Sequence, residues 1–137
     1  MSRFEVLGKV CWLYSHSPLH KAWSMEVLDR IHVPAIIHAQ YRLFEVDGSP
    51  VAWLCWAWLG EEARAKYIED PDSLAPKDWR SGSYLWFIDL CAPFGHLPLV
   101  KQELRSSEFK GETANFLRVK AGKTTGRLGR VVDVHGR

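Results

Sequence analysis

The sequence predicts a single α/β domain over residues 1–137, with a central, mostly antiparallel sheet flanked by helices. Segments with the 3.6-residue spacing of amphipathic helices alternate with short apolar runs that are typical of strands. Two pairs of these runs are separated by turn sequences, which favours antiparallel hairpins. With 137 residues, of which 47% are hydrophobic, the chain is long and apolar enough to bury one core.

The N-terminal part of the chain is expected to be helical. A helical spacing of apolar residues runs over 4–14 and is carried by Phe4, Leu7, Cys11 and Tyr14. Ser17 and Pro18 are residue types of a helix cap and a first helical position, so His20 should lie just inside a helix start. A further helix is expected from residue 24, interrupted before Pro34 because the residue preceding a proline disfavours helical backbone.

The rest of the chain alternates strands and helices. Strands are expected at 40–46, 50–59, 84–91, 115–120 and 127–134, helices at 61–68 and 97–105, and a loop at 70–83. Asp47-Gly48 between the first two strands is a strong hairpin signal. Trp53, Trp56 and Trp58 should fill both faces of the second strand as core residues, with a slot for a fatty acyl chain as the functional alternative.

Side chains alternate along a strand, which gives the run at 84–91 two expected faces. These are Phe87, Asp89 and Cys91 on one face, and Trp86, Ile88 and Leu90 on the other. Cys91 would then lie near Asp89, where a carboxylate raises the pKa of a thiol and weakens it as a nucleophile. We therefore interpret Cys91 as a packing residue.

Composition narrows the choice of environment. No apolar run approaches the ~18 residues needed to span a bilayer, so stable membrane insertion is not expected. The N-terminus lacks the pattern of a signal peptide. The three cysteines, Cys11, Cys55 and Cys91, form an odd set in apolar contexts, which favours reduced, buried thiols and a cytoplasmic location.

Charge is unevenly distributed, although the formal net charge is only +2. The segment 113–137 contains one acidic residue, Asp133, and six basic residues, which are Arg118, Lys120, Lys123, Arg127, Arg130 and Arg137. This asymmetry predicts an acidic partner for the segment, with a solvated basic face as the alternative. Nucleic acid is not expected, because the chain has no recognised nucleic-acid motif.

The candidate catalytic residues are His20 and Asp89. Asp89 is a lone carboxylate in an apolar, strand-like run, and a buried carboxylate is costly unless it is paired or hydrogen-bonded. An imidazole is a natural partner, and a His–Asp pair is a common base near neutral pH. A structural ion pair is the alternative. No metal site is expected, because Pro18 interrupts the i, i+4 spacing of His16 and His20.

These residues fall within an ordered set of short motifs that runs from residue 6 to 136. The set comprises Val6-Leu7-Gly8, Trp12-Leu13, the run 17–23, Pro34-Ala35-Ile36, Gln40-Tyr41, Pro50-Val51-Ala52, Trp56-Ala57, Tyr67, Ser73-Leu74, Asp78-Trp79, Ser81-Gly82, the run 86–95, Leu117-Arg118-Val119 and His135-Gly136. In order and spacing it resembles the toxin-activating lysine acyltransferases, cytoplasmic enzymes that acylate internal lysines of RTX protoxins.

The resemblance implies a fold like that of the GCN5-related N-acetyltransferases. It also implies an acyl-acyl carrier protein co-substrate without a bound cofactor, a protoxin substrate, homodimers, and an essential histidine and aspartate that fall on His20 and Asp89. We expect His20 to act as the base and Asp89 to orient it, with acylation of His20 as an alternative. Ser17, Arg118, Arg127 and Arg130 are the expected substrate-binding residues, the first through oxyanion donors in the turn 17–20 and the arginines through an acidic carrier protein.

Departures from the family pattern keep two other functions open. Family members often carry asparagine where this chain has Ile31, and they usually continue past His135-Gly136 into a C-terminal helix. These differences favour a catalytically weakened binding module. The other alternative is a coenzyme A-dependent N-acetyltransferase, although the glycine-rich pyrophosphate loop of that group is not found in this sequence.

Overall fold

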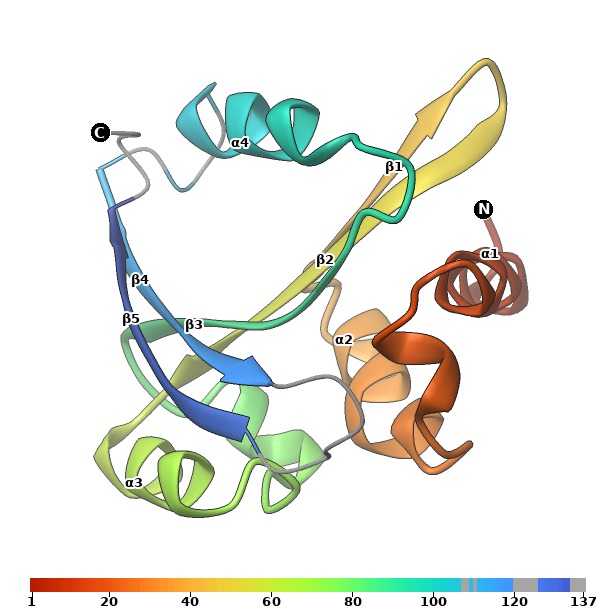
Figure 1. Ribbon diagram of the computed structural model, residues 1–137. Helices are drawn as coiled ribbons and strands as arrows, with labels where there is room; N and C mark the ends of the chain where they lie inside the picture. Colours follow the sequence, from red (N-terminus) through yellow and green to blue (C-terminus); the bar gives the residue numbers. More distant parts are fainter. Residues whose placement is uncertain (107–108, 110, 120–125, 134–137) are drawn as a thin grey trace.

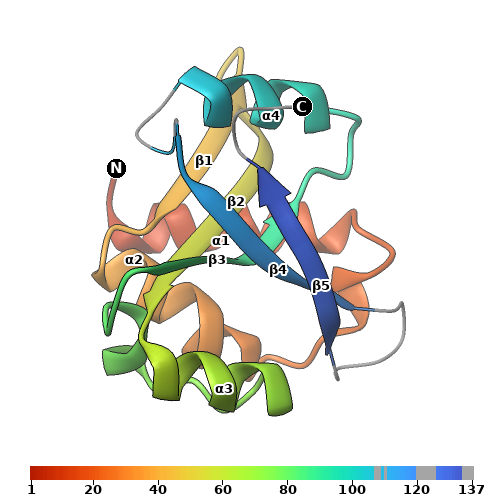
Figure 2. The same cartoon turned by 90° about the vertical axis from the view of Figure 1, so that its left-hand side faces the viewer.

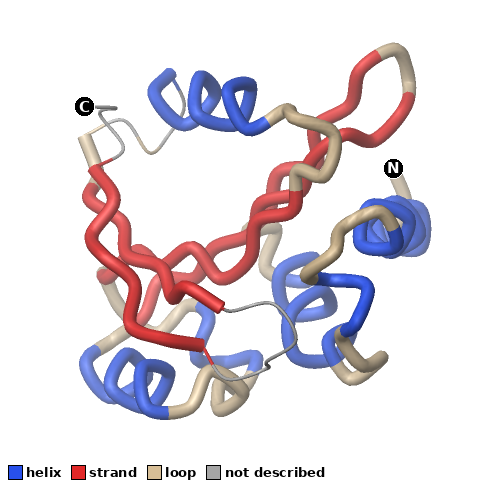
Figure 3. The backbone as a smooth tube through the Cα atoms, viewed as in Figure 1, coloured by secondary structure: helices blue, strands red, loops and turns tan. Residues whose placement is uncertain are grey.

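A five-stranded mixed sheet forms the centre of the computed structural model, which describes residues 1–106, 109, 111–119 and 126–133. The strands are β1 (Tyr41–Val46), β2 (Ser49–Leu59), β3 (Tyr84–Cys91), β4 (Thr113–Val119) and β5 (Gly126–Asp133), and they lie side by side in chain order. Neighbouring strands are antiparallel except β3 and β4, which are parallel. The predicted mostly antiparallel sheet with flanking helices is therefore confirmed, and Figure 3 shows the strands as one curved layer.

Helices cover both faces of this sheet (Figure 1). The helices α1 (Arg3–Ser15), α2 (Val33–Ile37) and α3 (Glu61–Glu69) contribute to one apolar cluster or pack beside it. The helix α4 (Leu97–Ser106) contributes to a second cluster on the opposite face. Figure 2 shows the β4–β5 hairpin in front of the other strands. In the part of the chain that the structure describes, no helix is long and apolar enough to cross a membrane.

Local sequence explains the hairpin and the first helix. Asp47 and Gly48 both have positive φ, 52° and 81°, as the predicted tight turn between β1 and β2 requires. Ser2 caps α1 by accepting a hydrogen bond from the Glu5 N–H at 3.1 Å. The buried stripe of α1 is Val6, Val10, Leu13 and Tyr14. The helix is confirmed, but the expectation that Cys11 is a buried thiol is wrong, because Cys11 faces solvent on the opposite side.

Two predictions about the helical segments before β1 are wrong. The turn after Pro18 forms only a 3₁₀ helix, His20–Ala22, and not the start of a longer helix. The chain also stays helical through Pro34, where an interruption was expected. A π-helical turn, Leu28–His32, precedes α2, and the Val33 N–H donates to the Leu28 carbonyl. The wider turn changes the hydrogen-bond pattern just before the proline, which has no N–H to donate.

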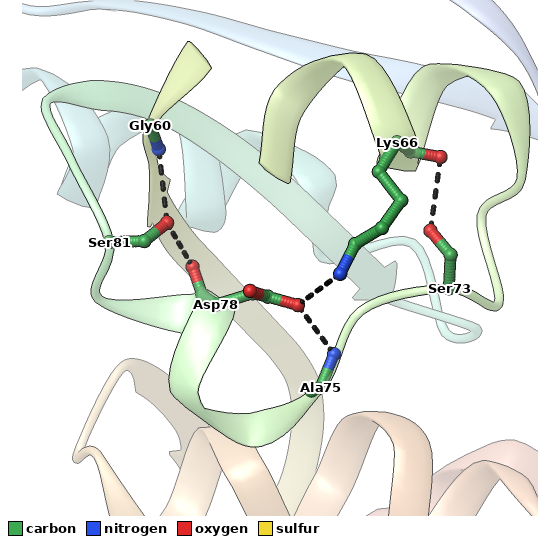
Figure 4. A network of polar contacts seen from close by, with 6 residues as sticks. All are labelled: Gly60, Lys66, Ser73, Ala75, Asp78 and Ser81. Atoms are coloured by element: carbon green, nitrogen blue, oxygen red, sulfur yellow. Dashed lines mark hydrogen bonds and ion pairs between the residues drawn. The ribbon is translucent and has the colours of Figure 1, made fainter. Parts of the chain in front are cut away.

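The expected loop at 70–83 contains a 3₁₀ helix, Pro76–Trp79, that is fixed by a polar network (Figure 4). Asp78 Oδ2 accepts hydrogen bonds from Lys66 Nζ and from the Ala75 N–H, both at 2.8 Å. Burial tends to raise the pKa of the Asp78 carboxyl, but these two donors outweigh it and hold the pKa below its ordinary value. The Ser81 hydroxyl donates to the Asp78 carbonyl and accepts from the Gly60 N–H, so the loop is joined to the end of β2.

Gly82 should be intolerant of any side chain. A Cβ at this position would lie 2.4 Å from the Gly60 Cα and 2.7 Å from the Leu59 carbonyl oxygen, both of which are backbone atoms that cannot rotate away. We expect Gly82→Ala to lower the free energy of unfolding by about 1–3 kcal/mol or more. Gly8→Ala is the matched control, because its Cβ would meet nothing within 4 Å, and it should stabilise α1 by up to about 1 kcal/mol. Denaturant unfolding measures both, and equal stability of the two variants would contradict the prediction.

Candidate active site

A β-bulge in β3 sets the direction of the Asp89 side chain. In the pairing of β2 with β3, Cys55 faces Asp89 and Trp56 faces Phe87, so Ile88 is an extra residue on β3. Such a bulge changes the alternation of side chains across the strand. Ile88 therefore packs on the same face as Trp86 and Cys91, whereas Phe87 packs on the face of α4.

The bulge corrects the expected faces of β3. The prediction that Phe87 shares a face with Asp89 and Cys91 is wrong, because strict alternation was assumed across a position where the register shifts. Asp89 and Cys91 do lie on one face, since Asp89 contacts Tyr14 of α1 and Cys91 belongs to the cluster beneath that helix. Asp89 is thus directed toward α1 and the turn that follows it.

His20 and Asp89 form the predicted pair, although they are 69 residues apart in sequence. The His20 Nε2 atom lies 2.8 Å from Asp89 Oδ1, and the two residues are only 5% and 7% exposed. The Tyr14 hydroxyl donates a hydrogen bond to the other carboxylate oxygen, Oδ2. Burial, reinforced by the Asp89 charge, raises the pKa of Tyr14 well above its usual value, so Tyr14 stays a proton donor.

Ser17 completes a chain of hydrogen-bonding groups. Its Oγ lies 2.6 Å from His20 Nδ1, and the same oxygen accepts the His20 backbone N–H at 3.2 Å. Because the Asp89 carboxylate is best satisfied by an Nε2–H donor, Nδ1 carries the lone pair and Ser17 O–H donates to it. The three side chains therefore have the hydrogen-bonding order of a Ser–His–Asp triad, with the two ring nitrogens exchanged relative to the serine proteases.

Aromatic rings hold the imidazole in this orientation. The His20 ring lies 4.4 Å from the Tyr14 ring and 4.6 Å from the Trp23 ring, measured between centroids. Because both neighbours are packed in the core beneath α1, the ring has little room to turn. A fixed ring is what a base that must present one nitrogen requires.

His32 is a second imidazole beside the pair that the sequence did not single out as a site residue. It lies on the π-helical turn, is fully buried, and its ring centroid is 4.8 Å from that of Tyr14. Neither of its ring nitrogens has a hydrogen-bond partner among the described residues. Burial lowers the pKa of His32 to about 4, with Asp89 opposing and His20 adding to that shift. His32 is therefore uncharged at neutral pH.

The buried cysteines beside the site are thiols, as expected. Burial and then the Asp89 charge raise the pKa of Cys91 to about 12. The same two causes raise the pKa of Cys55 well above its usual value. The interpretation of Cys91 as a packing residue agrees with its place in the core cluster. Among the described residues, no group of three or more potential metal ligands converges.

The remaining site predictions concern Ile31 and the arginines. Ile31 lines a small, mainly apolar pocket with Trp23, Trp79 and Ile88, so it makes no polar contact with the His20–Asp89 pair. The backbone of Arg118 in β4 pairs with that of Arg127 in β5, and Arg130 lies further along β5. The side chains of these three arginines lie outside the described part of the structure, as do Lys120, Lys123 and the segment 134–137.

The fold and the buried Ser17–His20–Asp89 chain define an α/β protein with a site whose geometry suits proton transfer. The model of the RTX toxin acyltransferase family matches residues 1–132. The chain therefore belongs to this family, as its motifs predicted.

Known relatives agree with this assignment. The leukotoxin-activating lysine-acyltransferase LtxC of Aggregatibacter actinomycetemcomitans is 42% identical over 135 residues, which cover 98% of this chain and 78% of LtxC. The leukotoxin-activating lysine-acyltransferase LktC serotype A11 of Mannheimia haemolytica is 48% identical over 75% of this chain and 62% of its own length. The protein-lysine myristoyltransferase RtxC of Kingella kingae is 39% identical over 97% of this chain and 81% of RtxC.

His32 should make the stability of the fold depend on pH. Its pKa is about 4 in the folded protein and near 6.5 in the unfolded chain, so the unfolded chain binds more protons as the pH falls below about 6.5. At about 1.4 kcal/mol per pKa unit, roughly 3 kcal/mol of stability should be lost between pH 7.5 and pH 4. His32→Phe and His32→Gln cannot take up this proton, so both should lose less stability over the same range. Denaturant unfolding at pH 7.5 and pH 4 measures the difference, and parallel losses in all three proteins would refute the assignment.

Proposed function

We propose that this chain is a protein-lysine acyltransferase, which transfers a fatty acyl group from acyl carrier protein to lysine side chains of an RTX-type protoxin. The observation that carries the proposal is the buried Ser17–His20–Asp89 chain in a member of the RTX toxin acyltransferase family. Relatives named as toxin-activating lysine-acyltransferases and a protein-lysine myristoyltransferase support it.

The reaction needs a base beside the acyl thioester. A lysine side chain has a pKa of about 10.4, so little free amine is present at neutral pH. In this proposal His20 accepts the amine proton at Nδ1, the nitrogen on the side of Ser17, while Asp89 holds Nε2–H and stabilises the imidazolium that forms. Tyr14 keeps the Asp89 carboxylate in place by donating to its other oxygen.

The turn 17–20 limits where the oxyanion donors can come from. The Ser17 N–H donates to the Tyr14 carbonyl, the His20 N–H donates to Ser17 Oγ, and Pro18 has no N–H. Leu19 is therefore the remaining N–H in this turn, and it is the donor that we assign to the developing oxyanion. In this proposal the oxyanion-donor role predicted for the turn 17–20 therefore belongs to one backbone group, the Leu19 N–H.

The edge of β3 beside Asp89 is the proposed approach for the acyl donor. The parallel pairing of β3 with β4 runs from Leu85–Ala114 to Phe87–Phe116, and among the described residues it does not extend to Asp89. The two parallel strands β3 and β4 thus stop pairing just before the Asp89 carboxylate. This separation supports our proposal that the fold is like that of the GCN5-related N-acetyltransferases. The exposed rings of Trp12 and Phe94, 5.5 Å apart, offer apolar surface for the acyl chain at the end of α1.

The partners and setting complete the proposal. We place the enzyme in the cytoplasm as a homodimer with no resident cofactor, where acyl carrier protein is the co-substrate. Arg118, Arg127 and Arg130 lie on β4 and β5, the strands that follow β3 in the sheet, and basic residues there would attract an acidic carrier protein.

Removing either member of the catalytic pair should abolish most of the activity. His20→Ala removes the base and Asp89→Asn removes the charge that orients it, so each should lower turnover by at least about 10²-fold. Asp29→Asn, at an exposed position, is the control and should leave turnover unchanged. Acylation of a purified RTX protoxin fragment, followed by intact-mass measurement, provides the assay. Near-normal transfer by both variants would show that the pair is structural.

The donor prediction can be tested through charge. Arg127→Glu with Arg130→Glu should raise the apparent KM for acyl carrier protein by reducing the rate of association, with little change in turnover at saturating donor. The wild-type KM for acyl carrier protein should rise with salt, because salt screens electrostatic attraction and the screening length is only about 8 Å at physiological ionic strength. A KM that neither change affects would place the carrier elsewhere, and efficient transfer from acyl-coenzyme A would favour the coenzyme A-dependent alternative.

A further inference from the structure

We infer that Ser17 is the nucleophile of this site, and that the acyl group is carried as an ester on its Oγ before it reaches the lysine. The inference rests on the proposed function and specifies its chemical course. It assigns a covalent role to a residue that the sequence marked only as a substrate-binding turn residue.

Access to His20 is the first argument. Both of its ring nitrogens are engaged, Nε2 by Asp89 at 2.8 Å and Nδ1 by Ser17 at 2.6 Å, and the residue is 5% exposed. An incoming amine therefore finds no free ring nitrogen while Ser17 keeps this position. Ser17 is itself buried, at 7% exposed, but it lies between the exposed residues His16 and Pro18, and its hydroxyl occupies the Nδ1 side of His20 from which an amine would have to approach.

The hydrogen bonds around Ser17 Oγ are the second argument. With Asp89 holding Nε2–H, the serine proton points to the Nδ1 lone pair, and the oxygen has one lone pair beyond the one that accepts the His20 N–H. The His20 backbone N–H donates to the same oxygen at 3.2 Å, which stabilises negative charge that develops on it. A hydroxyl with a base on its proton and a donor on its oxygen is an activated nucleophile.

The neighbouring groups are poorer nucleophiles. Burial and the Asp89 charge raise the pKa of the Cys91 thiol to about 12, so it is protonated at neutral pH. The Tyr14 hydroxyl is buried and donates to Asp89. Among these three groups, Ser17 is thus the one whose proton faces the His20 imidazole, the base of the proposed mechanism.

The proposed steps balance as two acyl transfers. Ser17 Oγ attacks the thioester carbonyl carbon while its proton moves to His20 Nδ1, and the C–S bond then breaks as that proton passes to the departing thiol. A substrate lysine amine next attacks the Ser17 ester, and its proton moves to Nδ1. The C–Oγ bond breaks, Oγ takes the proton back, and the amide is released with the enzyme unchanged.

The test begins with the enzyme and its donor alone. Wild-type protein incubated with myristoyl-acyl carrier protein, without protoxin, should gain the mass of one acyl group, and fragmentation should place it on Ser17. An oxygen ester survives hydroxylamine at neutral pH and is cleaved by it at alkaline pH, whereas a thioester is cleaved at neutral pH and an acyl-imidazole on His20 hydrolyses quickly. Ser17→Ala should form no adduct, and Ser17→Cys should form an adduct that is a thioester. Ser15→Ala is the matched control, because its hydroxyl is exposed and bonds the Trp12 carbonyl and the adjacent His16 ring, away from His20.

Activity provides the second measurement. Ser17→Ala should lower protoxin acylation by about 10²-fold or more while its thermal unfolding stays close to that of wild type, and double-reciprocal plots for wild type should show a ping-pong pattern. An adduct on His20, or near-normal transfer by a folded Ser17→Ala, would overturn the inference and leave the proposed function intact. Failure of wild-type protein to transfer an acyl group from any carrier to any protoxin would overturn the proposed function instead.

Discussion

The buried carboxylate of Asp89 is the constraint on which the rest of the site depends. A carboxylate in an apolar interior is stable only when its oxygens are satisfied, and here His20 and Tyr14 each take one oxygen. These partners come from the turn after α1 and from α1 itself, so the same two contacts that satisfy the charge also join the N-terminal helix to the centre of the sheet. Loss of either partner would leave a buried charge half-satisfied, so the contacts that the proposed chemistry needs are also contacts on which packing depends.

Two irregularities of the backbone position the side chains of Asp89 and His32. The bulge at Ile88 places Asp89 on the face of α1, and the π-helical turn before Pro34 brings His32 against Tyr14. Regular structure would not place both groups there, because strict alternation and a continuous α-helix would turn one of them away. Bulges and π-turns are frequent at functional sites for this reason.

The sequence was sufficient to predict the order of helices and strands and the His20–Asp89 pair. A lone charged residue in an apolar strand needs a partner, and this need can be recognised from the sequence alone. The bulge and the π-turn were not predictable, because tertiary packing decides both and the local pattern resembles regular structure. Tyr14 and His32 were missed for a related reason, since a tyrosine or histidine on an apolar helix face has the same sequence pattern whether it packs or bonds. Cys11 was misplaced because α1 is apolar on more than one side, so its spacing does not identify which side is buried.

The two imidazoles beside Asp89 differ in their hydrogen-bond partners. His20 is hydrogen-bonded to the carboxylate, whereas His32 packs against the rings of Tyr14 and Trp53 and has no hydrogen-bond partner for either nitrogen among the described residues. Burial therefore keeps the pKa of His32 at about 4, and it adds no positive charge to the site at neutral pH. A positive charge on His32 would oppose the effect of the Asp89 charge and make His20 a weaker base. Because the second imidazole stays neutral, it does not offset the negative charge of Asp89, which favours the proposed role of His20 as a base that accepts a proton at the nitrogen facing Ser17.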